Sequence, residues 1–445
     1  MSRSLWHRSR WAVALVMALV SVLFAGACGS GEPAGDGAEQ PARRDQRAPI
    51  AVAAGEPIVI GVSAPLTGPD EALGAEDRDA VIVGVERWKA ANGAQIKGHE
   101  IQILVEDDGC TESEITIQAA ERLLRQRGLV GVIGPDCSAG AQAAIPVYAG
   151  AGIVAISGSA TQSDLAESQP EGRFFFRTAY RNDLEGALAG QFASLAIQAG
   201  TVYLVDDGES YGKDLANNAQ RVMEESGSEV TRASVARGTV DFSELAAEVA
   251  RENPDLVGFA GFNPEAALLY RQLRDAGYKG AFGAGDAAAS APTFIEPVGA
   301  EAEGVFFAGC SLTLQEDFAA DLRELHGREP EASAFVAQYA DAVTVLLDAV
   351  AEVAVEGADG SLSIDPLALR DAVRATKLED GLSGSIAFDD KGDRIPVGVA
   401  TLSEFQDWAI GSGDVNVYAA LGLVGCQVQD GRLVNVSGPG AQPLR

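Results

Sequence analysis

The chain contains 445 residues, of which 47% are hydrophobic, and its formal net charge is −31 at pH 7. This length is sufficient for two domains of ordinary size, each with its own core. An acidic surface repels phosphate backbones and anionic membranes, so the charge argues against nucleic acid as a partner. The charge favours solubility and does not identify a small ligand.

The first 27 residues have the features of an export signal. Three arginines precede an apolar run at 11–24, which is too short to span a bilayer comfortably, and small residues follow it. Cys28 then resembles the acylated cysteine of a bacterial lipoprotein; the alternative is a plain signal peptide with Cys28 as a bystander. Residues 28–56 have the composition of a flexible linker. We expect an extracytoplasmic protein, anchored to the outer face of the cell membrane by lipid at Cys28.

Four further cysteines follow the signal: Cys110, Cys137, Cys310 and Cys426. An exported chain meets an oxidising compartment, where an even number of cysteines indicates disulfides. A bridge between Cys110 and Cys137 would close a short loop and contribute about 3–4 kcal/mol. Cys310 and Cys426 would then be left for a long-range bridge.

From residue 57 onward, strand-like apolar runs alternate with helix-like amphipathic stretches. Strands are expected at 58–62, 101–105, 129–133, 153–156, 174–176, 202–205, 230–235, 256–260, 281–282 and 304–307, with helical patterns between most of them. Continuous apolar strands that alternate with helices indicate parallel sheets covered on both faces. Two successive sets of this kind predict two similar lobes. The helices expected at 318–325 and 335–353 would return to pack on one lobe.

Short polar residues follow three of the expected strands, where ligands bind in open α/β sheets. The segments 134–138 and 157–161 offer hydroxyls and backbone N–H groups that suit a carboxylate, although plain N-capping by Ser and Thr is the alternative. The third segment is 208–212, after the strand at 202–205. Asp286 follows the strand at 281–282 and can receive a ligand ammonium, or is a solvated loop acid. Tyr211 and Phe262 can line a pocket or pack in a core.

An enzyme hypothesis rests on residues 208–212, which match the G-x-S-x-G elbow of serine hydrolases around Ser210. The base would have to be His326, for which a position in the last turn of a helix is the simpler explanation. Metal-ligand spacings are absent from the sequence, and 389–393 is better explained as an acidic turn than as a calcium loop.

Taken in order, these segments resemble the branched-chain amino-acid-binding proteins of ABC transporters, which have the type I periplasmic binding protein fold. The resemblance extends from about Ile58 to about Val434. Its motifs are at 61–68 (GVSAPLTG), 96–98, 106–110, 133–138, 156–161, 207–212, 261–265, 384–389 and 392–393.

The resemblance implies an α/β fold class with two Rossmann-like lobes, parallel central sheets and a multi-strand hinge. Lobe 1 would comprise 57–179 and 307–383, lobe 2 would comprise 180–306 and 384–436, and 437–445 would be a tail. It also implies a disulfide between Cys110 and Cys137. The residues implied for the ligand are Ser138, Ser159, Ala160 and Thr161 for the carboxylate, Asp286 for the ammonium, and Tyr211 and Phe262 for the pocket wall in lobe 2.

The expected function is capture of a small amino acid, aliphatic or branched-chain, and its delivery to a transporter permease by a monomeric protein without a cofactor. Three departures from the family affect the ligand. Leu73 and Phe262 replace common aromatic and tyrosine residues, and Asp286 is found where some members use Glu. Urea, a short amide or an aromatic acid therefore remain alternative ligands, and a ligand sensor remains an alternative role.

Overall fold

The structure is a computed structural model. It describes residues 48–443, apart from 171, 311–313, 328–329, 331–332, 400, 404, 406–408, 410–411, 413 and 438–440. The predicted export signal and Cys28 lie outside the described residues.

The first sheet has six strands in the order β3-β4-β2-β5-β6-β7. These strands are Gln95–Ile96 (β3), His99–Asp107 (β4), Ile58–Ala64 (β2), Leu129–Ile133 (β5), Val154–Ser157 (β6) and Phe175–Arg177 (β7). All neighbouring pairs are parallel except β3 with β4. Every residue of β2, β5 and β6 is buried, as expected for strands that are covered on both faces.

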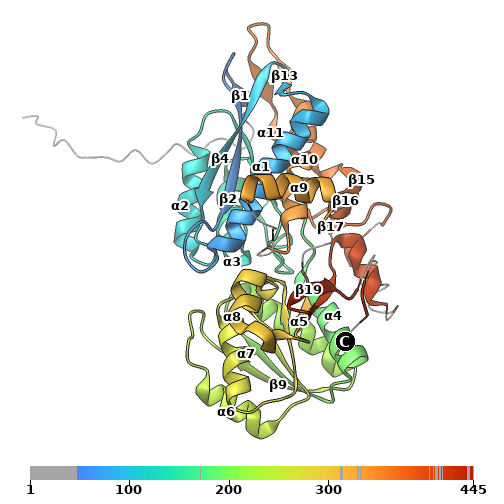
Figure 1. Cartoon of the computed structure of the whole chain (residues 1–445). Coiled ribbons are helices and arrows are strands. Elements are labelled where there is room, and N and C mark those ends of the chain that lie inside the picture. The colour runs from blue at the N-terminus through green and yellow to red at the C-terminus, as the bar shows by residue number, and fades with distance from the viewer. Residues whose placement is uncertain are drawn as a thin grey trace, which may run out of the picture. The chain divides into compact units, whose positions relative to one another are not determined.

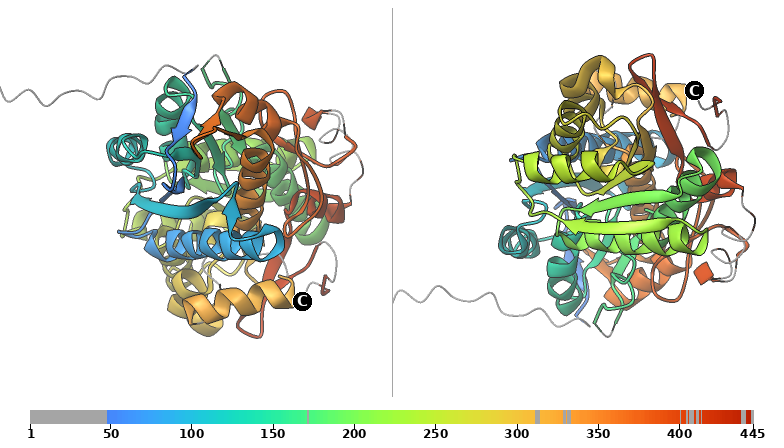
Figure 2. Two further views of the ribbon diagram at one scale, coloured as in Figure 1. Left: turned by 90° about the horizontal axis from the view of Figure 1, so that it is seen from above. Right: turned by 90° about the horizontal axis from the view of Figure 1, so that it is seen from below.

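The second sheet has seven strands in the order β19-β18-β12-β11-β10-β8-β9. They are Arg432–Asn435 (β19), Gly425–Gln429 (β18), Phe306–Ala308 (β12), Ala281–Gly285 (β11), Leu256–Ala260 (β10), Thr201–Asp206 (β8) and Glu229–Ser234 (β9). Strands β8 to β12 are parallel, whereas β18 and β19 join the β12 edge antiparallel. In Figures 1 and 2, helices lie on both faces of this sheet. They are Asn182–Gln191 (α4), Ser210–Glu225 (α5), Ser243–Glu252 (α6), Glu265–Asp275 (α7) and the short Glu296–Val298 (α8).

Two three-stranded sheets complete the fold. One contains Ile50–Val52 (β1), Leu362–Ile364 (β14) and Val355–Glu356 (β13); the other contains Lys377–Gly381 (β15), Gly384–Phe388 (β16) and Arg394–Ile395 (β17). Strand β1 lies within the segment predicted as a flexible linker. Its residues Ile50 and Val52 are buried in the core of the first sheet, so the ordered chain begins earlier than its composition indicates.

The chain crosses between the two large sheets three times in the described residues: between β7 and α4, after β12, and before β18. The predicted boundary at 306–307 falls inside β12, whose three residues pair with both β11 and β18. Phe388, which lies beyond the predicted boundary at 383–384, meets Phe176 of β7 edge-on in the first sheet, with ring centroids 5.3 Å apart. Hereafter the first lobe is the six-stranded sheet with the elements that pack on it, and the second lobe is the seven-stranded sheet with its helices.

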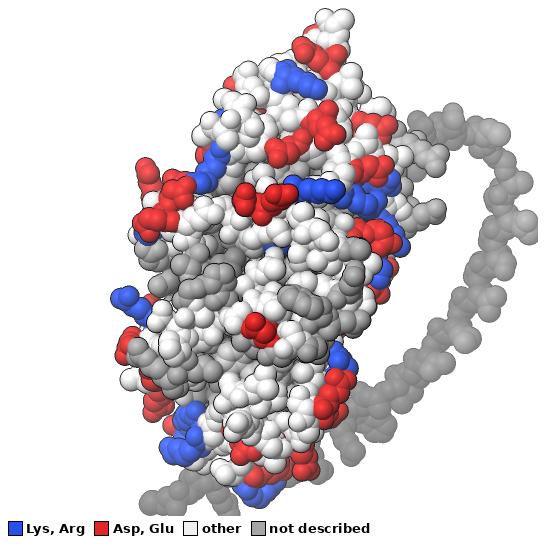
Figure 3. Space-filling model, turned by 90° about the vertical axis from the view of Figure 1, so that its right-hand side faces the viewer, with Lys and Arg blue, Asp and Glu red and all other residues white. Residues whose placement is uncertain are grey.

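Disulfides join Cys110 to Cys137 and Cys310 to Cys426. The first fastens the end of β4 to the start of a helix in the first lobe, and the second fastens the end of β12 to β18. None of the helices in the described part of the chain has the length and apolar character that a bilayer span requires. On the face shown in Figure 3, acidic and basic side chains are interspersed.

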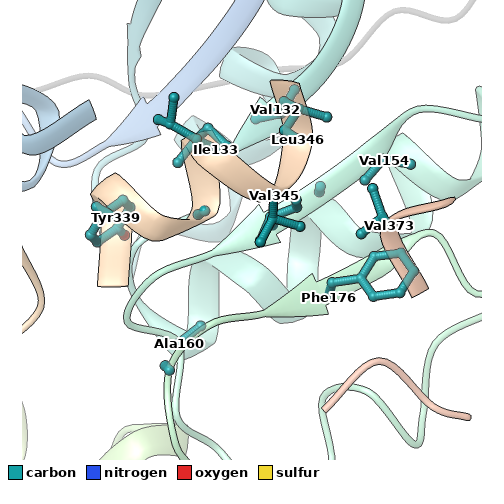
Figure 4. Close-up of a cluster of buried hydrophobic side chains, with 14 of the residues drawn as sticks. Val132, Ile133, Val154, Ala160, Phe176, Tyr339, Val345, Leu346 and Val373 are labelled. Atoms are coloured by element: carbon teal, nitrogen blue, oxygen red, sulfur yellow. The ribbon is translucent and has the colours of Figure 1, made fainter. Parts of the chain in front are cut away.

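The helices of the first lobe are Glu71–Asn92 (α1), Ser113–Leu124 (α2), Ser138–Gly150 (α3), Glu316–His326 (α9), Val336–Val353 (α10) and Pro366–Arg374 (α11). Helix α10 packs against α1, β5 and β6. Figure 4 shows Tyr339, Val345 and Leu346 of α10 beside Val132 and Ile133 of β5. The late helical segment therefore returns to the first lobe, as its apolar pattern predicts.

Candidate functional site

A cavity lies between the two lobes, beyond the carboxyl ends of strands from both large sheets. Its first-lobe wall is Leu73, Asp136, Cys137, Ser138, Ser159, Thr161 and Phe335, and its second-lobe wall is Tyr211, Phe262, Asp286 and Ala287. The cavity encloses about 20 Å³, which is room for about one water. Six of the seven predicted ligand residues line it, and the exception is Ala160, which is buried beside it.

The first-lobe wall combines hydroxyls with the start of α3. Ser138 is the first residue of α3, so backbone N–H groups of the first helical turn lie at this end of the cavity. The Ser138 hydroxyl oxygen accepts the backbone N–H of Gln162 at 3.1 Å, which joins α3 to the loop that carries Thr161. These groups are donors without a formal charge, and they suit an anion such as a carboxylate.

A buried arginine holds the loop after β6 in place. The Nη1 of Arg177 donates to the carbonyls of Ala160 at 3.0 Å and Gln162 at 2.7 Å. The same guanidinium forms an ion pair with Asp393 at 2.6 Å, and both side chains are fully buried. Because the two carbonyls flank Thr161, this ion pair fixes the part of the backbone that positions the Thr161 side chain. Arg177 could not be predicted from the sequence, since its partner Asp393 lies far along the chain.

The second-lobe wall contains a buried carboxyl group at Asp286, directly after β11. Its Oδ1 accepts the Tyr211 hydroxyl at 2.8 Å, and its Oδ2 accepts the Tyr180 hydroxyl at 3.0 Å. Asp286 is 4% exposed, and burial raises its pKa to about 6 although both tyrosines lower it. The carboxyl is therefore an acceptor whose charge depends on pH near neutrality.

Glu185 of α4 is a second buried acid beside Asp286. Its Oε1 accepts the backbone N–H of Asp286 at 2.9 Å, and burial together with the neighbouring carboxylate raises the pKa of Glu185 well above its usual value. Two adjacent carboxyls cannot both ionise at low cost, so Glu185 keeps the proton while Asp286 carries the charge. Neither Glu185 nor Tyr180 was predicted from the sequence, because both lie in the crossing segment and not at a strand end.

Asp136 adds a second carboxyl to the cavity wall, from the first lobe. The Ser159 hydroxyl donates to its Oδ1 at 2.7 Å and lies 2.7 Å from the Tyr339 hydroxyl. Burial raises the pKa of Asp136 to about 7, and the charge of Asp108 acts in the same direction. Asp136 belongs to a motif that supported the family resemblance, but it was not among the residues predicted to bind the ligand.

An arginine joins the two lobes beside the cavity. Nη2 of Arg237, in the loop after β9, donates to both carboxylate oxygens of Asp70, at 2.6 and 2.8 Å. Asp70 directly precedes α1 in the first lobe. The Arg237 guanidinium also lies over the ring of Phe262 at 4.3 Å from its centroid, and that ring meets Tyr211 edge-on at 5.2 Å. A second contact between the lobes joins the hydroxyl and backbone N–H of Ser163 to Asp214 of α5, both at 2.8 Å.

The residues of the enzyme hypothesis are not paired with one another. The Ser210 hydroxyl is buried at the start of α5 without a hydrogen-bond partner in the described part of the chain. His326 lies on α9 in the first lobe, where its Nδ1 is 2.5 Å from Oδ2 of Asp79. Asp389 accepts the backbone N–H groups of Lys391, Gly392 and Asp393 at 2.9 Å each, which is the geometry of an acidic turn.

Two α/β lobes, three connections and a cavity at the carboxyl ends of both sheets define a two-lobed solute-binding fold. The model of the periplasmic binding protein family matches residues 57–407, and the chain belongs to this family. The predicted type I periplasmic binding protein fold is thereby confirmed.

Individual relatives agree with this assignment. The chain is 26% identical over 345 residues to a leucine-, isoleucine-, valine-, threonine- and alanine-binding protein of Pseudomonas aeruginosa, a match that covers 76% of this chain and 88% of the relative. It is 32% identical over 226 residues to an amino acid binding protein of the same species, covering 51% of this chain and 59% of that protein's length. The crystal structure of a leucine-binding protein from Thermotoga maritima superposes with a TM-score of 0.70 at 25% identity, covering 86% of this chain and 99% of the other.

Proposed function

We propose that this protein is the extracytoplasmic solute-binding component of an ABC transporter and captures a small amino acid between its lobes. The observation that carries the proposal is the distribution of charge around one cavity. Hydroxyls and a helix N-terminus lie in the first lobe, whereas a buried carboxyl held by two tyrosines faces them from the second lobe. A zwitterion satisfies both walls at once. The amino-acid-binding relatives support the same ligand class.

In the proposed mode of binding, Ser138, Thr161 and the first turn of α3 receive the ligand carboxylate. Asp286 receives the ammonium, while Glu185 stays protonated beside it. The family resemblance assigns the Ala160 backbone and Ser159 to the carboxylate as well, and Tyr211 and Phe262 to the wall. Aliphatic and branched-chain amino acids are the ligands that the relatives indicate.

Binding requires the lobes to separate and close again. The cavity is walled by buried side chains from both lobes, so a ligand enters when the two walls move apart. The contacts of Arg237 with Asp70 and of Asp214 with Ser163 would break on opening and form again on closure. A ligand that touches both walls then favours the closed form by the contacts that it makes only there.

The remaining sequence predictions are part of the proposal. The export signal and the lipid at Cys28 rest on the sequence motif, the permease partner on the family, and the monomeric state on the family resemblance. We propose lobe boundaries at the three crossings between the large sheets, with β12 and 425–435 in the second lobe. A binding role without catalysis is proposed because no base among the described residues accepts the Ser210 hydroxyl proton. Unchanged ester turnover in Ser210→Ala would support this, and its abolition would revive the hydrolase hypothesis.

The test of the function is thermal unfolding of residues 29–445 with a panel of amino acids, amides, urea and aromatic acids. A ligand that binds only the folded state raises the melting temperature in a saturable way. The proposal expects such a rise with small amino acids, after unfolding and refolding to remove any ligand that co-purifies. A rise of the melting temperature only with uncharged or aromatic compounds would be compatible with the fold assignment but would refute the amino-acid assignment.

A further inference from the structure

The part of the cavity that the ligand side chain must occupy is defined once the two charged ends of an amino acid are assigned. This inference rests on the proposed function. The hydroxyls of Ser138 and Thr161 take one end and Asp286 takes the other. What remains of the first-lobe wall is apolar at Leu73 and Phe335, and acidic at Asp136.

Asp136 is the acidic residue of this wall. It is 2% exposed and lies three residues after the end of β5, in the loop that leads to α3. Its Oδ1 accepts the Ser159 hydroxyl at 2.7 Å. No hydroxyl or N–H among the described residues reaches its Oδ2.

The neighbour of Asp136 on the protein side is the carboxyl of Asp77 in α1. The Ser333 hydroxyl donates to Oδ1 of Asp77 at 2.5 Å. Burial, together with the charge of Asp136, raises the pKa of Asp77 well above its usual value, so Asp77 keeps its proton beside the Asp136 carboxyl. Asp136 therefore presents acceptor capacity to the cavity, because each carboxylate oxygen accepts more than one hydrogen bond.

A ligand with a purely aliphatic side chain would cover this acceptor without satisfying it. A buried polar group that loses water and gains no partner is costly, whereas a ligand donor placed against it removes that cost. Leu73 and Phe335 provide apolar contact for the stem of the side chain.

We propose that Asp136 is a specificity-determining residue that selects amino acids whose short side chain carries a hydrogen-bond donor, a hydroxyl or an amide, on an apolar stem. The donor bonds to the Asp136 carboxyl, and the stem lies against Leu73 and Phe335. Threonine and asparagine fit this description better than their near-isosteres valine and leucine.

The experiment is calorimetric titration of the refolded protein with the near-isosteric pairs threonine and valine, and asparagine and leucine. In the wild type, the donor-bearing member of each pair should bind about tenfold tighter. Asp136→Leu should reverse the preference or reduce it to parity, whereas Asp136→Asn retains an acceptor and should retain the preference. Melting curves show whether each variant is folded.

Three results would overturn the proposal. Equal affinity within both pairs in the wild type refutes it without any variant, which covers the case that Asp136→Leu does not fold. An unchanged ratio in Asp136→Leu also refutes it. An equal loss for all four ligands in that variant would instead mean that Asp136 binds the part common to all amino acids. Failure of the proposed function is distinguishable, because then no amino acid binds the wild type.

Discussion

Asp286 and Glu185 are two carboxyl groups buried against each other, and their shared protonation state controls what the second lobe can bind. The groups that face Asp286 are the hydroxyls of Tyr180 and Tyr211 and the carboxyl of Glu185. None of them is a cation. A charged Asp286 is therefore stabilised by hydrogen bonds alone in the described structure, and a ligand ammonium would supply the missing positive charge.

Substitution of Asp286 tests this role directly. Asp286→Asn keeps the shape and removes the charge, so amino-acid affinity should fall by more than about tenfold, the loss of one charge-assisted bond. Titration calorimetry measures the change. The matched control is Asp255→Asn. Asp255 directly precedes β10 and accepts the backbone N–H groups of Gly200 and Thr201 at the start of β8, the end of that strand away from the cavity. Equal affinities for wild type and Asp286→Asn would exclude Asp286 as the ammonium partner.

The affinity should also depend on pH through the same residue. Burial raises the pKa of Asp286 to about 6, and only the ionised form attracts an ammonium. Affinity should therefore be nearly constant above about pH 7 and fall by about tenfold per pH unit well below pH 6. Binding at pH 6 should release protons, which calorimetry in buffers of different ionisation enthalpy detects.

Burial raises the pKa of Asp136 to about 7, so this second acid titrates in the same range and requires its own control. In Asp136→Asn the fall below pH 6 should persist, whereas in Asp286→Asn it should disappear. Persistence of the fall in Asp286→Asn would assign the pH dependence to a different group.

At the scale of secondary-structure elements, the loop after β9 meets the turn before α1. Arg237 in this loop contacts Asp70 of the first lobe and covers Phe262 of the cavity wall. Both charged side chains are largely buried, with 12% and 8% exposure, so water screens this pair less than an exposed one. Through this contact, closure of the lobes also fixes the position of the Phe262 ring in the cavity wall.

Removal of this contact should affect dissociation more than association. Arg237→Gln should raise the dissociation rate of the ligand about fivefold, because the ion pair with Asp70 exists only in the closed form, whereas the contacts of Arg237 with Asp207 and Glu265 inside the second lobe are lost from both forms. Stopped-flow fluorescence measures both rates. The control is Arg232→Gln, which breaks an ion pair with Asp206 at 2.6 Å inside the second lobe. A similar effect of both variants would mean that the loss arises from the stability of the second lobe.

The parallel strands of both large sheets were predictable from the sequence, because buried parallel strands form continuous apolar runs between helical patterns. Strands β3, β18 and β19 at the sheet edges were not predicted, and neither was β1, whose run has only three residues next to a Gly- and Pro-rich stretch. The run at 304–307 predicted the strand β12 but did not indicate which sheet it joins. Of the site, the strand-end residues such as Ser138 and Asp286 could be predicted. Arg237, Glu185 and Tyr180 could not, because their roles arise from contacts between distant segments.

For the whole molecule, buried acids link stability to pH. Burial is the largest cause that raises the pKa values of Asp108 and Asp286 to about 6 and of Asp136 and Asp207 to about 7. The folded protein therefore binds these protons more tightly than the unfolded chain does. The resulting stabilisation is complete below about pH 4 and is lost as the pH rises through 6 to 7.

The melting temperature of the ligand-free protein should accordingly be higher at pH 5 than at pH 8, by at least about 5 °C. Scanning calorimetry at constant ionic strength measures the difference. Charge repulsion in a chain with net charge −31 acts in the same direction, but high salt screens it, whereas the effect of burial persists in salt. A melting temperature that is equal or higher at pH 8 in high salt would contradict the prediction.

The antiparallel addition of β18 and β19 to the β12 edge has a consequence for how the chain reaches its folded state. Cys310 and Cys426 at this junction are separated by 116 residues, so the β12–β18 pairing forms late compared with contacts between neighbouring segments. Until then, β12 presents an open edge that carries Phe306 and Phe307, and open apolar edges template pairing with other chains. Refolding yield should therefore decrease with protein concentration, and a chain truncated before Gly425 should aggregate.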